Sequence, residues 1–148
     1  MCPSDEYMTE ATQESGMLSI EGKRALIIDD DRRNIAVLRK MLDQMLVKST
    51  AIDDSRNIEA RLLEVDHPDI IFLDLEMPGT SGYDVLKMLQ GSRKFVNVPI
   101  VACTVHTSQM NKGKAAGFHS FLGKPLDSHT FPDQLRRILS GNPVWETL

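Results

Sequence analysis

The sequence has few cysteines and no long apolar run, and each absence argues against a class of protein. Its two cysteines, Cys2 and Cys103, lie far apart, which fits a reducing cytoplasm better than a disulfide-stapled secreted domain. No segment approaches the roughly 18 consecutive apolar residues of a membrane span. The first 22 residues lack the basic region and the apolar stretch of a signal peptide. We therefore expect a cytoplasmic protein that does not contact a membrane.

Basic residues are absent from residues 1–22, whereas acidic residues are frequent there. This segment contains Asp5, Glu6, Glu10, Glu14 and Glu21, and hence a charge of −5. Since the whole chain carries −4, the remaining residues carry +1, which gives no sign of a nucleic-acid surface. The acidic segment, rich in Ser, Thr and Gln, is typical of an extension that packs weakly. We predict an extension at 1–22, one domain at 23–140 and a short tail at 141–148.

From Lys23 onward, apolar runs of strand length alternate with segments of helical periodicity. Ser55 is the expected N-cap of the second helix, and Gly117 is the expected end of the fourth. The alternation predicts a single doubly wound α/β domain, with five parallel strands and five helices on both faces of the sheet. The strands are expected at 25–28, 47–52, 69–74, 100–104 and 118–123, and the helices at 32–46, 55–65, 82–89, 107–116 and 128–140.

Polar residues follow the apolar runs where four of these strands end. The first strand is followed by Asp29, Asp30 and Asp31, the third ends in Asp74, the fourth ends in Thr104, and the fifth leads into Lys124. In a parallel sheet all these ends lie at one edge, where sites of doubly wound folds form. Three carboxylates, one hydroxyl and one ammonium group are therefore predicted to share a pocket, with Asp31 acting as a helix cap.

Electrostatics limits what such a pocket can hold. Two carboxylates about 5 Å apart repel by about 3 kcal/mol at an effective dielectric constant of about 20, so the group needs a cation. Oxygen ligands in a small open site favour Mg²⁺, with Mn²⁺ as the alternative. Lys124 and Thr104 offer the charge and the hydrogen-bond donor that a phosphoryl group needs. A carboxylate nucleophile in this setting is equipped to form an acyl phosphate.

The sequence resembles the receiver domain of bacterial two-component response regulators from about Lys23 to Ser140. The resemblance rests on four motifs in family order: Ile27-Ile28-Asp29-Asp30, Asp74-Leu75-Glu76-Met77-Pro78-Gly79 with Gly82, Ile100-Val101-Ala102-Cys103-Thr104, and Phe121-Leu122-Gly123-Lys124-Pro125. It implies the flavodoxin-like fold of CheY-type proteins. It also implies a cis peptide at Lys124–Pro125.

The resemblance assigns a role to each residue at the strand ends. Asp74 is the implied phosphoacceptor, supplied by a histidine kinase or a histidine phosphotransfer protein. Asp30 and Asp74 are the implied direct Mg²⁺ ligands with the backbone carbonyl of Glu76, and Asp29 holds the ion through water. Thr104 and Lys124 bind the phosphoryl oxygens.

A switch follows from the same resemblance. Phe121 turns inward as Thr104 moves, which alters the face made by helix 4, strand 5 and helix 5 for a downstream effector or for homodimerisation.

Two positions depart from the commonest family pattern. Val105 stands where a small residue is usual, and its bulk is expected to narrow access to Asp74. Glu76, two residues after Asp74, is expected to influence the lifetime of the phosphorylated state, in a direction that the sequence leaves open.

The leading hypothesis is a stand-alone response regulator, a signalling switch and not an enzyme, since only eight residues follow the last predicted helix. One alternative is a non-phosphorylated interaction module, which Val105 alone suggests. Another is a haloacid-dehalogenase-type phosphatase with Asp29 as nucleophile, but Arg33 stands where that motif has Thr or Val.

Three further residues are expected to have structural roles. Cys103 is predicted to be a small buried hydrophobe. His106 is predicted to lie on the surface near the mouth of the site. Trp145 is predicted to pack the C-terminal tail back onto the domain.

Overall fold

The computed structural model describes residues 19–146. The main sheet contains β1 (Arg24–Ile28), β2 (Lys48–Ile52), β3 (Ile70–Leu73), β6 (Ile100–Thr104), β7 (Ser120–Gly123) and β8 (Trp145–Glu146). The helices are α2 (Arg32–Gln44), α3 (Ile58–Glu64), α4 (Gly82–Gln90), α5 (Met110–Ala116) and α6 (Phe131–Leu139), with 3-10 turns at Arg93–Phe95 and Thr107–Gln109. Among the described residues, no helix is long and apolar enough to cross a membrane.

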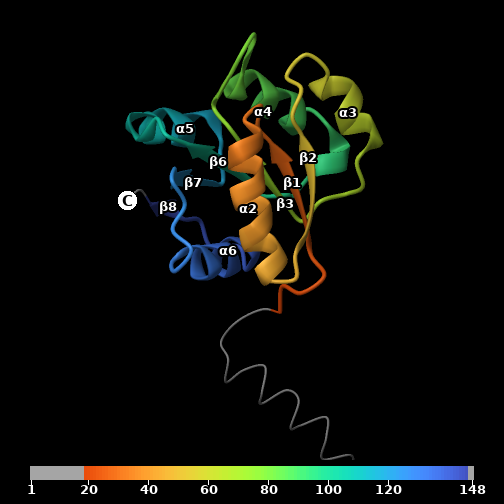
Figure 1. Ribbon diagram of the computed structural model, residues 1–148. Helices are drawn as coiled ribbons and strands as arrows, with labels where there is room; N and C mark the ends of the chain where they lie inside the picture. Colours follow the sequence, from red (N-terminus) through yellow and green to blue (C-terminus); the bar gives the residue numbers. More distant parts are fainter. Residues whose placement is uncertain (1–18, 147–148) are drawn as a thin grey trace, which may run out of the picture.

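All six strands of the main sheet are parallel, in the order β2-β1-β3-β6-β7-β8 (Figure 1). The first five follow the doubly wound order in which sites form at the switch point between β1 and β3. The α/β class is confirmed, and the sheet has one strand more than predicted. The sixth strand was missed because two residues after a turn carry no periodic apolar signal.

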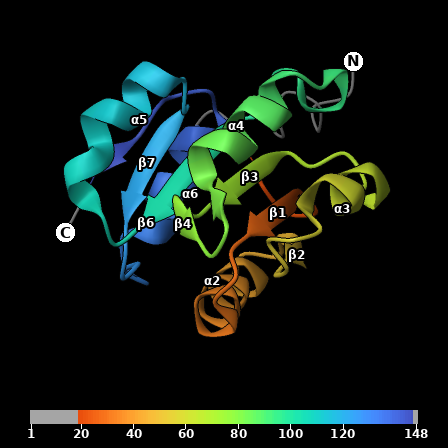
Figure 2. The ribbon, with the colours of Figure 1, turned by 90° about the horizontal axis from the view of Figure 1, so that it is seen from above.

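The sheet divides the core into two layers (Figure 2). Residues of β1 alternate between them, with Leu26 and Ile28 facing α3, α4 and α5, and Ala25 and Ile27 facing α2 and α6. This alternation follows from the two-residue period of a strand. Because both faces are covered, central strands such as β3 are apolar throughout and fully buried.

A two-stranded antiparallel hairpin lies beside the edge where β3 ends. It pairs β4 (Glu76–Met77) with β5 (Thr80–Ser81) around Pro78 and Gly79. Gly79 has a φ of 73°, which suits the third residue of a turn with proline second. Ser81 then caps α4, since its side chain accepts a hydrogen bond from the backbone N–H of Tyr83.

Some predicted boundaries differ from the observed ones. Ser55 is not the N-cap of α3: that position is Asn57, and the Ser55 hydroxyl donates to the Pro78 carbonyl at 2.8 Å. The hydroxyl therefore joins the loop after β2 to the β4–β5 hairpin, a contact that a sequence pattern does not reveal. The predicted end of α5 is confirmed, because Gly117 has a φ of 106°. Most of the predicted N-terminal extension, residues 1–18, lies outside the described residues, as do residues 147–148.

Candidate functional site

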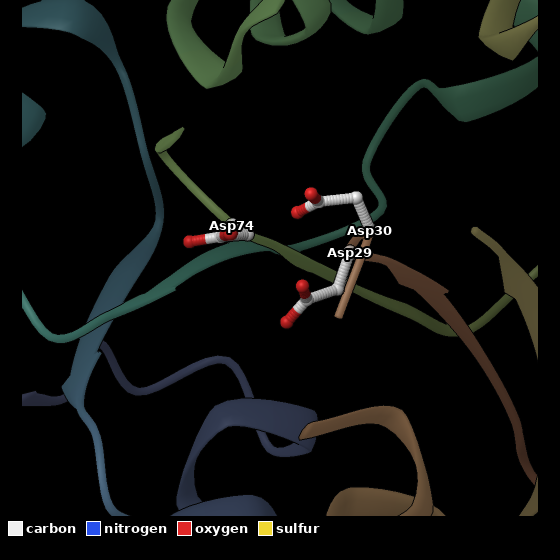
Figure 3. Close-up of side chains that lie close together, drawn as sticks. All are labelled: Asp29, Asp30 and Asp74. Atoms are coloured by element: carbon white, nitrogen blue, oxygen red, sulfur yellow. The ribbon is translucent and has the colours of Figure 1, made fainter. Parts of the chain in front are cut away.

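Three carboxylates meet at the carboxyl edge of the sheet, between β1 and β3 (Figure 3). Asp29, Asp30 and Asp74 each offer an oxygen, and these oxygens lie within 4.8 Å of one another. The backbone holds two of them in place: the Asp29 N–H donates to the Ile52 carbonyl, and the Asp74 N–H donates to the Ile28 carbonyl. The parallel ladder therefore continues to the residues that carry the carboxylates.

Lys124 adds the ammonium group to this cluster from the end of β7. Its Nζ donates to Asp29 Oδ2 at 2.7 Å and lies 3.8 Å from Asp74 Oδ1. All three side chains are largely buried, with 11% of Lys124, 6% of Asp29 and 13% of Asp74 exposed. The Lys124–Pro125 peptide is cis, as the resemblance implied. In this structure, the closer partner of Lys124 is Asp29.

The surroundings shift the acidity of both Asp74 and Lys124. The pKa of Asp74 is raised from 3.8 to about 6, mainly by burial; the charges of Asp29 and Asp30 also raise it, whereas Lys124 and the Glu76 N–H lower it. Burial alone lowers the pKa of Lys124, but the anionic groups around it, including Asp29 and Asp74, raise it on balance. At neutral pH Asp74 is therefore mostly ionised and Lys124 is charged.

The donor set fits a hard divalent cation. Three carboxylates face one ammonium group, so two negative charges remain uncompensated, and all the available donors are oxygens. Asp29 is already engaged, because Oδ2 accepts from Lys124 and Oδ1 accepts from the Asp31 N–H at 2.9 Å. Asp30 and Asp74 are left as the better candidates for direct ligation. Asp31 caps α2, since its side chain accepts from the Arg33 N–H.

Gly82 lets the first turn of α4 approach the loop that carries Asp74. A Cβ at this position would lie 2.6 Å from Leu75 Cα and would also meet the carbonyl oxygen of Asp74. The Gly82 N–H donates to the Leu75 carbonyl at 2.9 Å. A side chain here would therefore push the acceptor loop away from the helix.

A side-chain contact joins Glu76 to His106 beside the site, and no pattern in the sequence predicts it. His106 Nε2 lies 2.9 Å from Glu76 Oε2, which brings the hairpin after β3 against the loop after β6. The His106 N–H donates to Thr104 Oγ1 at 3.1 Å, and Thr104 is fully buried. His106 was expected on the surface near the site, and its side chain is 42% exposed; its contact with Glu76, 30 residues earlier in the chain, was not predicted. Val105, which lies between Thr104 and His106 in the sequence, has 62% of its surface exposed.

Phe121 and Cys103 lie in the core behind this edge. Phe121 is fully buried, and its ring stacks on Trp145 with ring centroids 6.4 Å apart. Cys103 is 4% exposed, as predicted, and burial raises the pKa of its thiol to about 12. The predicted site residues thus divide into a cluster of Asp29, Asp30, Asp74 and Lys124 and residues placed around it.

Comparison with known proteins identifies a family match. The family model "Response regulator receiver domain" matches residues 25–136. Stress response regulator protein 1 of Candida tropicalis is 30% identical over 108 residues, which are 70% of this chain and 40% of that protein. Protein PilH of Pseudomonas aeruginosa is 26% identical over 123 residues, which are 80% of this chain and 98% of that protein.

Solved structures show the same fold. Chemotaxis protein CheY4 of Vibrio cholerae superposes with a TM-score of 0.71 at 24% identity, over 79% of this chain and 98% of that one. The receiver domain of a sensor histidine kinase from Pseudomonas aeruginosa was solved with magnesium in its active-site cleft. It superposes with a TM-score of 0.70 at 25% identity, over 80% of this chain and 98% of that one. Some curated relatives are much longer: the chain spans 25% of the P. aeruginosa transcriptional regulator DctD.

Proposed function

The chain belongs to the response regulator receiver domain family, and from that premise we propose that it accepts a phosphoryl group on Asp74. The donor is a histidine kinase or a histidine phosphotransfer protein. The observation that carries the proposal is the cluster of Asp29, Asp30 and Asp74 with Lys124 at the carboxyl edge of the sheet. A receiver domain is a signalling module and not an enzyme.

Asp74 acts as the nucleophile in this proposal. One of its carboxylate oxygens attacks the phosphorus, the new O–P bond forms as the bond to the donor breaks, and the donor leaves with its electron pair. Its pKa of about 6 supports this role, because the carboxylate is mostly ionised at pH 7 and less well solvated than a surface one.

Lys124 and Thr104 bind the oxygens of the transferred group. Lys124 Nζ is 3.8 Å from Asp74 Oδ1, so a modest shift away from Asp29 brings its charge onto the phosphoryl group. Thr104 Oγ1 accepts from the His106 N–H, which leaves the hydroxyl proton available for donation to a phosphoryl oxygen. Both residues are thus prepared to bind added negative charge.

Asp30 and Asp74 would hold Mg²⁺ directly with the backbone carbonyl of Glu76, and Asp29 would hold it through water; Mn²⁺ suits the same donors. The bound ion would offset the charge of the carboxylates and of the incoming phosphoryl oxygens. Support comes from the all-oxygen cluster and from the magnesium in the cleft of the P. aeruginosa receiver domain. Without a cation, the carboxylates repel the phosphoryl group.

The output of the switch passes through Thr104 and Phe121 to the face of α5, β7 and α6. A downstream effector protein binds this face, or two copies dimerise through it. The domain proper comprises residues 23–140, to which β8 adds an edge strand. Stand-alone action in the cytoplasm is part of the proposal, supported by the match over 98% of PilH.

Glu76 and Val105, beside the site, influence the rates of dephosphorylation and of phosphorylation. Glu76 pairs with His106 and so lies where it can affect hydrolysis of the phosphorylated state. Val105 is exposed beside this pair, where its bulk hinders the approach of a protein phosphodonor more than that of a small-molecule phosphodonor.

Intact-mass measurement after incubation with acetyl phosphate tests the proposal. We expect one added phosphoryl group with Mg²⁺, none with EDTA, and none in Asp74→Asn. Asp54→Asn is a matched control, because Asp54 follows β2 and pairs with Arg56; this variant is expected to be labelled like the wild type. An adduct that persists in Asp74→Asn would move the chemistry to another acid. The absence of any adduct, with Mg²⁺ binding intact, would favour the non-phosphorylated module.

A further inference from the structure

The C-terminal strand β8 covers the outer edge of β7. It pairs in parallel, with Phe121 opposite Trp145 and Leu122 opposite Glu146, and lies beside α5 and α6 (Figure 1). This is the edge of the face that the proposed function uses for output. A partner that needs the edge of β7 therefore meets β8 first.

Backbone contacts attach the segment just before β8. The Phe121 N–H donates to the Val144 carbonyl at 2.8 Å, and the Val144 N–H donates to Ser120 Oγ at 3.0 Å. Both Ser120 and Val144 are buried, with 0% and 1% exposed. A strand of two residues contributes few ladder bonds of its own, so side chains must supply much of its attachment.

The two side chains of β8 attach to opposite faces of the sheet. Trp145 stacks on Phe121, with 20° between the ring planes, and Lys114 Nζ of α5 lies 4.9 Å from the Trp145 ring centre. Glu146 accepts hydrogen bonds from α6, at 2.9 Å from Gln134 Nε2 and at 2.9 Å from Arg137 Nη2. Of these two side chains, Trp145 is the one that contacts a residue of the proposed switch, Phe121.

Lys124 directly follows β7, three residues after Phe121. The Lys124 N–H donates to the Thr104 carbonyl at 2.8 Å, so both proposed phosphoryl-binding residues are joined to this part of the sheet. The Phe121 ring is closed in on the α5 side by Gly113, where a Cβ would lie 3.4 Å from the ring. A shift of Phe121 therefore disturbs its stacking on Trp145.

We propose that β8 is a strap that closes the edge of β7 and loosens when Asp74 is phosphorylated. The proposal rests on the proposed function and goes beyond it, since it assigns a regulatory role to residues 144–146. Loosening exposes the backbone groups at the outer edge of β7, a kind of edge that accepts extended segments of partner proteins. The unphosphorylated protein keeps that surface covered.

The test combines intact mass, tryptophan emission and hydrogen–deuterium exchange on the same sample of full-length protein. The chain has one tryptophan, so the emission reports on β8 alone. With acetyl phosphate and Mg²⁺, we expect a red-shifted emission and amide exchange at 118–124 that is faster by about fivefold or more, the lower end of typical coupling between sites. Unchanged emission and exchange in a sample that the mass shows to be phosphorylated would overturn the strap alone. Absence of the adduct would overturn the proposed function, and the coupling with it.

Variants separate the strap from general loosening of the fold. Trp145→Ala is expected to show fast exchange at 118–124 before any phosphodonor is added, with little further rise afterwards. Glu146→Gln weakens the α6 side only and should give a smaller rise of the same kind. Leu63→Ala, at an 80% exposed apolar residue of α3, is the matched control and should behave as the wild type. Slow exchange at 118–124 in unphosphorylated Trp145→Ala, equal to the wild type, would also refute the strap.

Discussion

Replacing Asp74 by asparagine is expected to stabilise the metal-free protein at neutral pH. The side chain is 13% exposed, and its pKa is raised from 3.8 to about 6, mainly by burial. A tenfold change in acidity corresponds to about 1.4 kcal/mol, so the ionised carboxylate costs the fold up to about 3 kcal/mol at pH 7. Asparagine has the same shape without the charge, and Lys124 keeps its closer partner Asp29 at 2.7 Å.

The dependence on pH distinguishes this cause from a general packing effect. Because the pKa of Asp74 is higher in the folded state, the folded protein binds the proton more tightly than the unfolded chain does. The contribution of Asp74 to stability is therefore greatest below pH 3.8 and is lost as the pH rises through about 6. The stability gain from Asp74→Asn should accordingly be largest at pH 7 and should shrink toward pH 4.

Urea unfolding of both proteins in EDTA, at several pH values, measures this difference directly. We expect a gain of about 2 kcal/mol at pH 7, somewhat below the upper bound because part of the carboxylate remains solvated. Other titrating groups are common to both proteins and cancel in the difference. Mg²⁺ should narrow the gap, since it binds the folded wild type more tightly than the variant. A variant no more stable than the wild type at pH 7, with a difference independent of pH, would refute the reasoning.

Other substitutions test the same cluster and its supports. Lys124→Met leaves the buried Asp29 carboxylate without its cation, so urea unfolding in EDTA should show a loss of about 3 kcal/mol; a loss below about 1 kcal/mol would mean that water replaces the ammonium group. Gly82→Ala presses a Cβ into the backbone after β3 and should cost about 2 kcal/mol in thermal unfolding, whereas Gly91→Ala meets its nearest atom at 3.4 Å and should cost less. Cys103, buried with a thiol pKa of about 12, should resist iodoacetamide at pH 8 until urea unfolds the chain, as peptide mass analysis would show; rapid labelling of the native protein would contradict its burial.

Much of the site could be predicted because strand ends carry its residues. Asp29 and Asp74 follow apolar runs that are fully buried in the structure, and Lys124 follows a third. In a parallel sheet, residues that follow such runs lie at one edge whatever the details of packing. The cluster of carboxylates therefore required only the assignment of the strands.

The pairing of Lys124 with Asp29 and the contact between His106 and Glu76 could not be predicted in the same way. Lys124 lies closer to Asp29 than to Asp74, and His106 pairs with Glu76 rather than standing alone. The preference of Lys124 is the difference between 2.7 Å to Asp29 and 3.8 Å to Asp74, and no spacing along the chain encodes side-chain positions of this kind. The hydrogen bond from the Ser55 hydroxyl to the Pro78 carbonyl could not be predicted for the same reason.

The sequence by itself determined the α/β class, the alternation of strands and helices, and the set of residues at the carboxyl edge. Burial on both sheet faces demands continuous apolar strands, and that demand is visible in the order of the residues. The tertiary structure alone decided which charges pair, how far burial raises the pKa of Asp74, and that residues 145–146 add a sixth strand against Phe121. Each of these depends on the distances between segments far apart in the chain, which exist only once the chain has folded.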